Sequence, residues 1–280
     1  MTTTANITEF YETWQSGHFS KKILIEGDSW VSHPFIGVEN LATQINGFKS
    51  NDYLILNIGD PGDEAKQVFE EGGEQYKKLQ RLISTEQWGE KFDLILLSAA
   101  GNDIVGEEIR KKGYVLNKRD YPNLYGKQLI STNFYKKVSE IIAGYDRFLQ
   151  FKSNTRNGST PVISHAYCYL TPREVGTHAG PIMFHKGWVK QHLKHQGITK
   201  DDEQYEIICE MLDSFYKAAK KLESSHPNFL MVDTRRILLK DNKPDLSLWH
   251  DEIHPTGQGF KLVAEHIRNT ARENGLWPIS

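Results

Sequence analysis

Residues 23–30 read ILIEGDSW, in which an apolar run ends at a glycine, an acid and a serine. A short apolar run followed at once by turn residues predicts a buried strand. Comparable runs recur at residues 53–58, 94–97, 161–164 and 229–232. Apolar residues at helical spacing lie between them, at residues 38–48, 64–83, 133–151, 206–222 and 259–270. The alternation predicts a parallel sheet with helices on both faces, a three-layer α/β/α sandwich.

The composition is that of an ordinary globular chain. The 280 residues are 38% hydrophobic and 25% charged, and no change in composition divides them, so we expect one domain over residues 1–280. Segments 105–128 and 170–202 are long for connections in such a fold, and we expect them to lie as insertions over the active-site edge. Cys168 and Cys209 are expected to be unpaired and packed as small apolar side chains.

The net charge and the hydropathy of the sequence indicate which classes of binding partner to expect. The formal net charge of -2 argues against nucleic acid or an anionic membrane surface as the main partner. The first 19 residues lack the basic start and apolar run of a secretory signal, and no later segment is apolar for long enough to cross a bilayer. We therefore expect a cytoplasmic protein, without membrane insertion, that acts on a small-molecule or glycan substrate.

Polar motifs follow three of the predicted strands. They are GDSW at residues 27–30, DPGD at residues 60–63 and AGND at residues 100–103. Ligands of open parallel sheets bind at the carboxyl ends of the strands, so these motifs are expected to share one site. Each motif alone is more often a helix cap, a turn or a loop, and only the set points to chemistry.

A serine hydroxyl becomes a nucleophile only when a base takes its proton, and Ser29 projects from a turn that suits this role. The base candidate is His254 in WHDEIHPTG, residues 249–257, where Asp251 can curl back to hold one ring nitrogen. The backbone N–H of Ser29, the N–H of Gly62 and the side-chain amide of Asn102 are the candidate donors for an oxyanion.

The four motifs in this order resemble the SGNH hydrolase superfamily, also called GDSL-like esterases and lipases. The resemblance runs from Gly27 past Gly257 and implies Ser29, Asp251 and His254 as the catalytic triad, with Gly62 and Asn102 in the oxyanion hole. It also implies a flavodoxin-like sheet of five parallel strands, hydrolysis of an acyl ester and no cofactor. Trp30 stands where the family usually has leucine.

Aromatic and histidine side chains near the predicted strand ends are candidates for contacts with the substrate: Trp30, His165, Tyr167, Tyr169 and Trp188. With the two insertions as a roof, we expect a small acyl group on a larger polar carrier, such as acetylated carbohydrate. Two alternatives remain open. One is a glycan- or peptide-binding protein that keeps the hydrolase frame without catalysis. The other is a metal-dependent hydrolase, because HDEIH at residues 250–254 partly matches a zinc motif, although Pro255 disfavours the helix this needs.

Overall fold

A parallel sheet forms the centre of the computed structural model. The model describes residues 2–32, 39–48, 53–84, 91–117, 124–176, 178–179, 182–183 and 187–278. Within them the main sheet has the strand order β1-β3-β2-β4-β5-β8, with every neighbouring pair parallel. Its strands are β1 (Thr2–Thr4), β2 (Lys21–Gly27), β3 (Tyr53–Asn57), β4 (Leu94–Ser98), β5 (Val162–His165) and β8 (Phe229–Val232).

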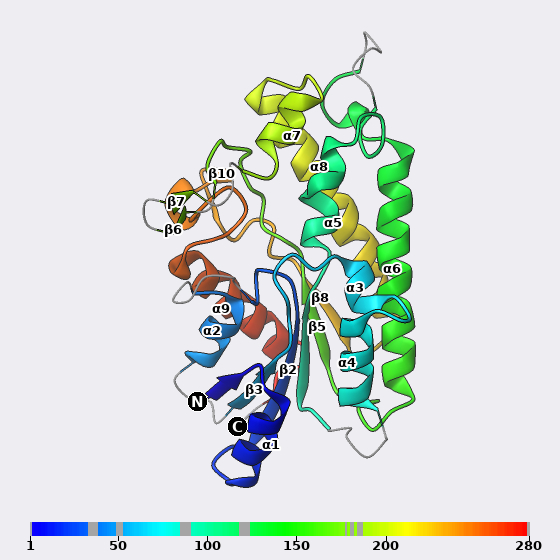
Figure 1. Ribbon diagram of the computed structural model, residues 1–280, viewed down its shortest axis with the longest axis vertical. Coiled ribbons are helices and arrows are strands. Elements are labelled where there is room, and N and C mark those ends of the chain that lie inside the picture. Colours follow the sequence, from blue (N-terminus) through cyan, green and yellow to red (C-terminus); the bar gives the residue numbers. More distant parts are fainter. Residues whose placement is uncertain are drawn as a thin grey trace.

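Helices cover both faces of this sheet (Figure 1). The helices α2 and α9 lie against one face, and α4, α6 and α8 lie against the other. The helices are α1 (Ile7–Gln15), α2 (Leu41–Asn46), α3 (Ala65–Phe69), α4 (Glu74–Ile83), α5 (Gly101–Val105), α6 (Thr132–Ser153), α7 (Lys190–His195), α8 (Asp201–Lys220) and α9 (Gly257–Glu273). The predicted three-layer α/β/α class is confirmed.

Smaller elements complete the described part of the chain. The short strands β6 (His178–Ala179) and β7 (Ile182–Met183) pair with each other, as do β9 (Leu239–Lys240) and β10 (Lys243–Pro244). The 3₁₀ turns are η1 (Glu107–Arg110), η2 (Gly126–Leu129), η3 (Lys221–Ser224) and η4 (Leu246–Leu248). None of the described helices combines the length and the apolar character that a bilayer crossing requires.

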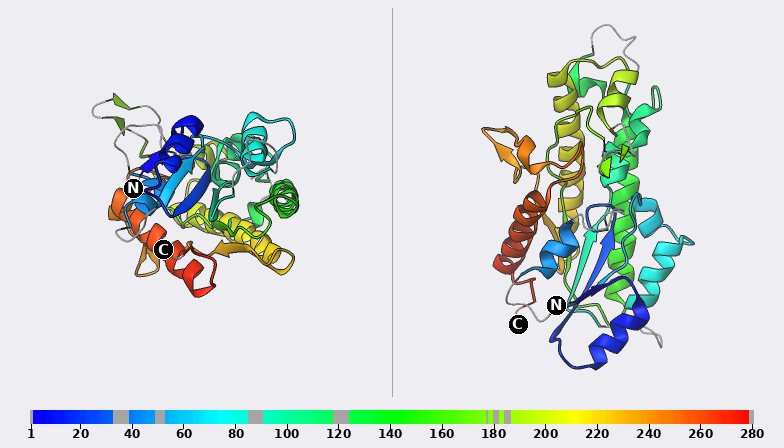
Figure 2. Two further views of the ribbon diagram at one scale, coloured as in Figure 1. Left: turned by 90° about the horizontal axis from the view of Figure 1, so that it is seen from below. Right: turned by 60° about the vertical axis from the view of Figure 1, so that its left-hand side comes forward.

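The sheet has one strand more than the five predicted. Five strands follow the flavodoxin-like order, and the sixth is β1, which pairs with β3 at the edge. Strand β1 was not predicted, because it consists of three threonines and carries no apolar run. Figure 2 shows the two chain termini on the side of the molecule away from α7.

Local sequence explains where the central strands and helices lie. Strand β2 is buried along nearly its whole length, as expected for a strand covered on both faces. The predicted helix over residues 64–83 is two helices, α3 and α4, because Gly72 adopts a φ of +99° between them. Helix α8 begins five residues before the predicted start, with Asp201, Asp202 and Glu203 in its first turn, where negative charge is favourable.

Candidate active site

Ser29 lies in a sharp turn at the carboxyl end of β2. The backbone of Gly27 passes so close to β4 that a Cβ there would lie 2.3 Å from the carbonyl oxygen of Ser98. Asp28 donates its N–H to that oxygen at 2.9 Å, and Val31 donates to the carbonyl of Asp28 at 3.1 Å. Glycine is therefore needed at this position, because a side chain would push the turn away from the sheet.

The imidazole of His254 reaches the serine. Its Nε2 lies 2.7 Å from Ser29 Oγ, and its Nδ1 lies 2.8 and 3.0 Å from the two carboxylate oxygens of Asp251. Ser29 is 8% exposed, His254 5% and Asp251 0%, so water screens these contacts little. Because an ionised carboxylate only accepts hydrogen bonds, Nδ1 carries the proton and Nε2 presents its lone pair to the serine hydroxyl.

The turn that carries Asp251 and His254 is closed by its own hydrogen bonds. Asp251 Oδ1 accepts the backbone N–H of Ile253 at 2.9 Å and that of His254 at 2.8 Å. The N–H of His250 donates to the carbonyl of His254 at 2.8 Å. Trp30 donates its indole N–H to the carbonyl of Ile253 at 3.1 Å, so the serine turn and the histidine turn are also joined outside the reacting atoms.

The two loops with the predicted oxyanion donors meet beside the serine turn. Asn102 donates its side-chain amide to the carbonyl of Asp63 at 2.9 Å, which ties the loop after β4 to the loop after β3. The N–H of Asp60 donates to the carbonyl of Gly27 at 2.9 Å. Gly62 has a φ of +90° and is exposed. Asn102 is among the described residues that line the cavity at the serine, and Gly62 is not.

Asp28 and Tyr167 form a buried pair behind the serine. The Tyr167 hydroxyl donates to Asp28 Oδ2 at 2.5 Å, and the N–H of Trp30 donates to Oδ1 at 3.0 Å. Burial raises the pKa of Asp28 to about 6, and both hydrogen bonds oppose the rise. A Cβ on Gly101 would lie 2.7 Å from Asp28 Oδ2, so glycine is needed here too. No role was predicted for Asp28, whose only signal in the sequence is its place between glycine and serine.

The cavity at Ser29 is small and mostly apolar. Its volume is about 20 Å³, which is room for about one water molecule. The described residues of its apolar wall include Trp30, Val105, Leu170, Trp188 and Ile253. The Trp188 ring meets the His254 ring edge to face, with centroids 5.4 Å apart and planes at 87°. A large flat side chain therefore lies directly beside the His254 ring.

Comparisons with known proteins identify the fold. No protein-family model matches the sequence, and no curated protein matches it. A structure from Streptococcus pneumonia named for a platelet activating factor aligns over 94% of this chain and 90% of its own, at 15% identity and a TM-score of 0.53. A catalytic mutant of an acetylxylan esterase from Geobacillus stearothermophilus aligns over 94% and 98%, at 14% identity and a TM-score of 0.50.

A third structure, named as a GDSL-like lipase from Parabacteroides merdae, aligns over 92% of this chain and 97% of its own, at 17% identity and a TM-score of 0.50. The chain has the fold of these esterase and lipase structures. The likeness to GDSL-like hydrolases, expected from the motifs, is thereby confirmed at the level of the fold.

Within this GDSL-like fold, three of the five candidate substrate contacts line the cavity at the serine: Trp30, Tyr167 and Trp188. Trp30 is only 4% exposed and packs against Phe260 as well, with ring centroids 5.5 Å apart. It is thus part of the core as much as of the cavity wall.

The other two candidates, His165 and Tyr169, form hydrogen bonds with other parts of the protein. His165 is 1% exposed, and its Nε2 lies 3.0 Å from the hydroxyl of Ser98. Burial lowers the pKa of His165 to about 4, so its ring is neutral at pH 7. Tyr169 donates its hydroxyl to the carboxylate of Asp213. Neither is among the described residues of the cavity wall.

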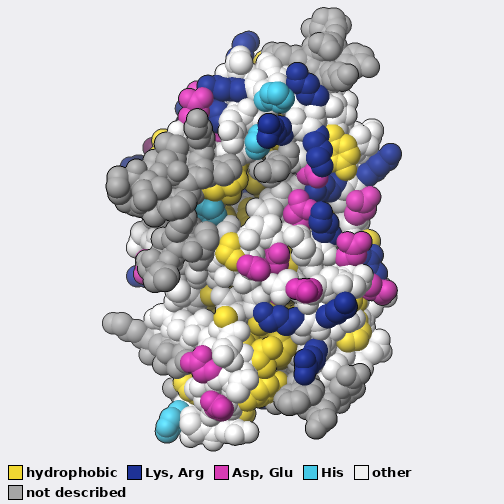
Figure 3. Space-filling view, in the orientation of Figure 1, with side chains coloured by type: hydrophobic (Ala, Val, Ile, Leu, Met, Phe, Trp, Pro, Cys, Tyr) yellow, Lys and Arg dark blue, Asp and Glu magenta, His cyan; other side chains and the backbone are white. Residues whose placement is uncertain are grey.

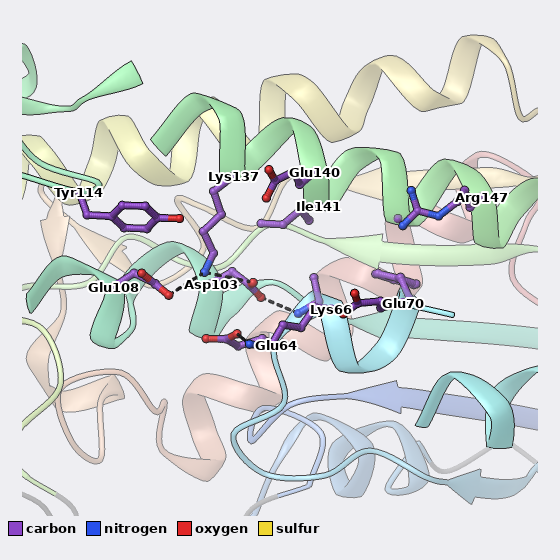
Figure 4. Close-up of a pocket in the computed structure, with 13 residues that line it drawn as sticks. Glu64, Lys66, Glu70, Asp103, Glu108, Tyr114, Lys137, Glu140, Ile141 and Arg147 are labelled. Carbon is purple, nitrogen blue, oxygen red and sulfur yellow. Dashed lines mark hydrogen bonds and ion pairs between the residues drawn. The ribbon is translucent and has the colours of Figure 1, made fainter. Parts of the chain in front are cut away.

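A larger cavity lies between α3, α5 and α6 (Figure 4). Its volume is about 420 Å³, and neighbouring residues of α5 face the two cavities, Asn102 the small one and Asp103 the large one. Lys137 Nζ lies 3.6 Å from Asp103 Oδ1 and 3.7 Å from Glu108 Oε1. Burial raises the pKa of Asp103 to about 6. Acidic and basic side chains gather over this part of the surface (Figure 3), and its described wall contains no serine, cysteine or histidine.

The histidines of the second insertion are not brought together where they are described. His192 is buried and His195 is exposed, although they are three residues apart. The side chains of His178 and His185 lie outside the described residues. In the described part of the chain, no three histidine, cysteine or carboxylate side chains are grouped as metal ligands would be.

Proposed function

We propose that this protein is a serine ester hydrolase of the SGNH type. The observation that carries the proposal is the hydrogen-bonded chain from Ser29 Oγ through His254 to Asp251, with contacts of 2.7 and 2.8 Å. A serine, an imidazole and a buried carboxylate in this order are what nucleophilic acyl transfer requires. The fold shared with an acetylxylan esterase and a GDSL-like lipase structure supports the same conclusion.

In the proposed reaction, Ser29 Oγ attacks the carbonyl carbon of the ester while His254 Nε2 takes the hydroxyl proton. Asp251 stabilises the imidazolium that forms. The negative oxygen of the tetrahedral intermediate accepts hydrogen bonds from the backbone N–H groups of Ser29 and Gly62 and from the amide of Asn102. The intermediate collapses, the alcohol leaves with the proton from His254, and the acyl group stays on the serine.

Water completes the cycle. His254 takes a proton from the water as its oxygen attacks the acyl carbon, and then returns the proton to Ser29 Oγ as the acid is released. The balance is one ester and one water consumed, and one alcohol and one acid formed. These steps call for no cofactor.

We propose a short acyl group, acetyl above all, on a polar carrier such as carbohydrate. The cavity of about 20 Å³ beside Ser29 supports this, because a longer chain would have to displace Trp188 or Leu170. We also propose that residues 1–280 act as one domain, since one sheet collects strands from residue 2 to residue 232. Segment 170–202 contributes both Leu170 and Trp188 to the cavity wall.

The test is labelling with a serine-directed fluorophosphonate, followed by peptide mapping, alongside aryl esters from acetyl to octanoyl and acetylated xylo-oligosaccharides. We expect label on Ser29 and the highest kcat/KM for acetyl esters. Hydrolysis that needs an added metal and leaves Ser29 unlabelled would favour the metal-dependent alternative. Glycan binding without labelling or turnover would favour the binding protein.

A further inference from the structure

Glu252 has no part in the reaction above, yet it is one of the most fully hydrogen-bonded carboxylates in the described structure. It follows Asp251 in the chain and is 1% exposed. Its Oε1 accepts two backbone N–H groups at 3.0 and 2.7 Å, and its Oε2 accepts one at 2.9 Å and one more. The donors all belong to the second insertion: Arg173, Trp188, Val189 and Lys190.

Four donors fill the accepting capacity of an ionised carboxylate. Burial raises the pKa of Glu252, and the four N–H groups oppose the rise because they stabilise the charged form. Gly187 comes so near that a Cβ there would lie 2.9 Å from Glu252 Oε2. The chain therefore wraps closely around this one side chain, and the contacts fix the backbone of residues 187–190.

The fixed segment carries the tryptophan that borders the base. Trp188 donates its N–H to Glu252, and its ring meets the His254 ring at a centroid distance of 5.4 Å. The side chain of Arg173 donates to the carbonyl of Asp251, which joins the same two segments a second time. Trp188 and Leu170 are the contribution of the insertion to the wall of the small cavity.

We propose that Glu252 is a positioning residue that sets the acyl size limit by holding Trp188 against His254. The inference rests on the proposed ester hydrolysis and adds to it the device that fixes selectivity. Without the carboxylate, residues 187–190 lose the acceptor that orders them, and the tryptophan can move off the cavity. The result is a wider cavity with the triad residues themselves unchanged.

The test substitution is Glu252→Gln, which keeps the volume and removes one acceptor oxygen. The amide nitrogen then faces two N–H donors where a carboxylate oxygen stood, so two of the four hydrogen bonds are lost. The matched control is Glu203→Gln. Glu203 is 0% exposed and accepts the backbone N–H of Gly126 at 3.3 Å, so it is a buried carboxylate that contacts the other insertion.

The first measurement does not need activity. Hydrogen–deuterium exchange, read by mass spectrometry on a peptide covering residues 187–193, should be at least about tenfold faster in Glu252→Gln than in the wild type. It should be unchanged in Glu203→Gln. Unchanged exchange in Glu252→Gln overturns the inference, whatever the enzyme does.

The second measurement is acyl selectivity, the ratio of kcat/KM for butyryl and acetyl aryl esters. We expect the ratio to rise by about tenfold or more in Glu252→Gln and in Trp188→Ala, because two methylenes then fit the cavity, and to stay within about twofold of wild type in Glu203→Gln. Trp188→Ala tests the same cavity if Glu252→Gln does not fold. Faster exchange with an unchanged ratio overturns the inference. Failure of the proposed function looks different: the wild type would hydrolyse no ester and Ser29 would not react with a fluorophosphonate.

Discussion

The two cavities that α5 borders differ in almost every property. The one at Ser29 holds about 20 Å³ behind an apolar wall, and the one at Lys137 holds about 420 Å³ among charged side chains. Among the described residues of the two cavities, only Ser29 in the small one has a hydroxyl 2.7 Å from an imidazole that a buried carboxylate orients. Volume alone therefore does not mark the candidate site, because acyl transfer requires a hydroxyl aligned with an imidazole and a carboxylate.

The largest expected effect comes from removing the side chain of Ser29 or of His254. We expect Ser29→Ala and His254→Ala each to lower kcat on an acetyl aryl ester by at least about two to three orders of magnitude, since each removes a group that forms or transfers a bond. Steady-state kinetics measure the loss. Arg147→Ala, in the large cavity, is the control and should stay within about twofold of wild type. Near-full activity in either triad variant would contradict the assignment.

Asp251→Asn should also lower kcat, by about one to two orders of magnitude less than the loss of the serine or the histidine, as in other triads. The amide can donate to Nδ1, which favours the tautomer whose proton is on Nε2, where Ser29 needs an acceptor. Because the side-chain oxygen can still accept the N–H groups of residues 253 and 254, the turn should persist. Kinetics together with a thermal melt separate the two effects. A loss of activity that tracks a loss of folding would speak against a role in orienting His254.

Asn102→Ala should lower kcat by about a hundredfold with little change in KM, as expected for a donor that acts on the oxyanion more than on the bound ester. Asn102 also donates to the carbonyl of Asp63 at 2.9 Å, so a drop in melting temperature is expected as well. Gly62→Ala gives the comparison for the other loop. A rise in KM with unchanged kcat in Asn102→Ala would contradict this role. It would mean that Asn102 binds the ester and does not stabilise the oxyanion.

Substitutions in the large cavity should have the smallest effect on the rate of hydrolysis. Their effect should appear in the free energy of unfolding. Asp103 has a folded-state pKa of about 6 against an ordinary value of 3.8. The folded state therefore binds this proton more tightly, and its contribution to stability is complete below pH 3.8 and is lost as pH rises through 6. Relative to Asp103→Asn, the unfolding free energy of the wild type should fall by up to about 3 kcal/mol between pH 4 and 7 in urea titrations. Parallel pH profiles for the two proteins would refute the shift.

The sequence predicts the central strands from their apolar runs, and the pairing of Asp251 with His254 from their short spacing. The meeting of Ser29 with His254, 225 positions apart, is predicted only because ligands bind at the strand ends and because the motifs resemble a known family. The acid and the base lie three residues apart, and one Asx-type turn is enough to join them. The placement of His165 and Tyr169 could not be predicted, because it depends on partners such as Ser98 and Asp213 far away in the chain.

Glu252 left no signal in the sequence at all. Its partners are backbone N–H groups, which every residue except proline carries, so no spacing or residue type reveals them. Strand β1 could not be predicted for a related reason. Three threonines pair with β3 through the main chain at a sheet edge, where burial does not demand an apolar pattern.

An anchor that contacts only the main chain leaves the neighbouring side chains open to change. The hydrogen bonds of residues 188–190 to Glu252 require only that each residue keeps its N–H, while Gly187 must stay small beside Glu252. A descendant of this protein could therefore exchange Trp188 for a smaller residue and accept a bulkier ester without rebuilding the loop. Under the proposed size limit, the contact that restricts the acyl group would also make a switch to another substrate possible in a single mutational step.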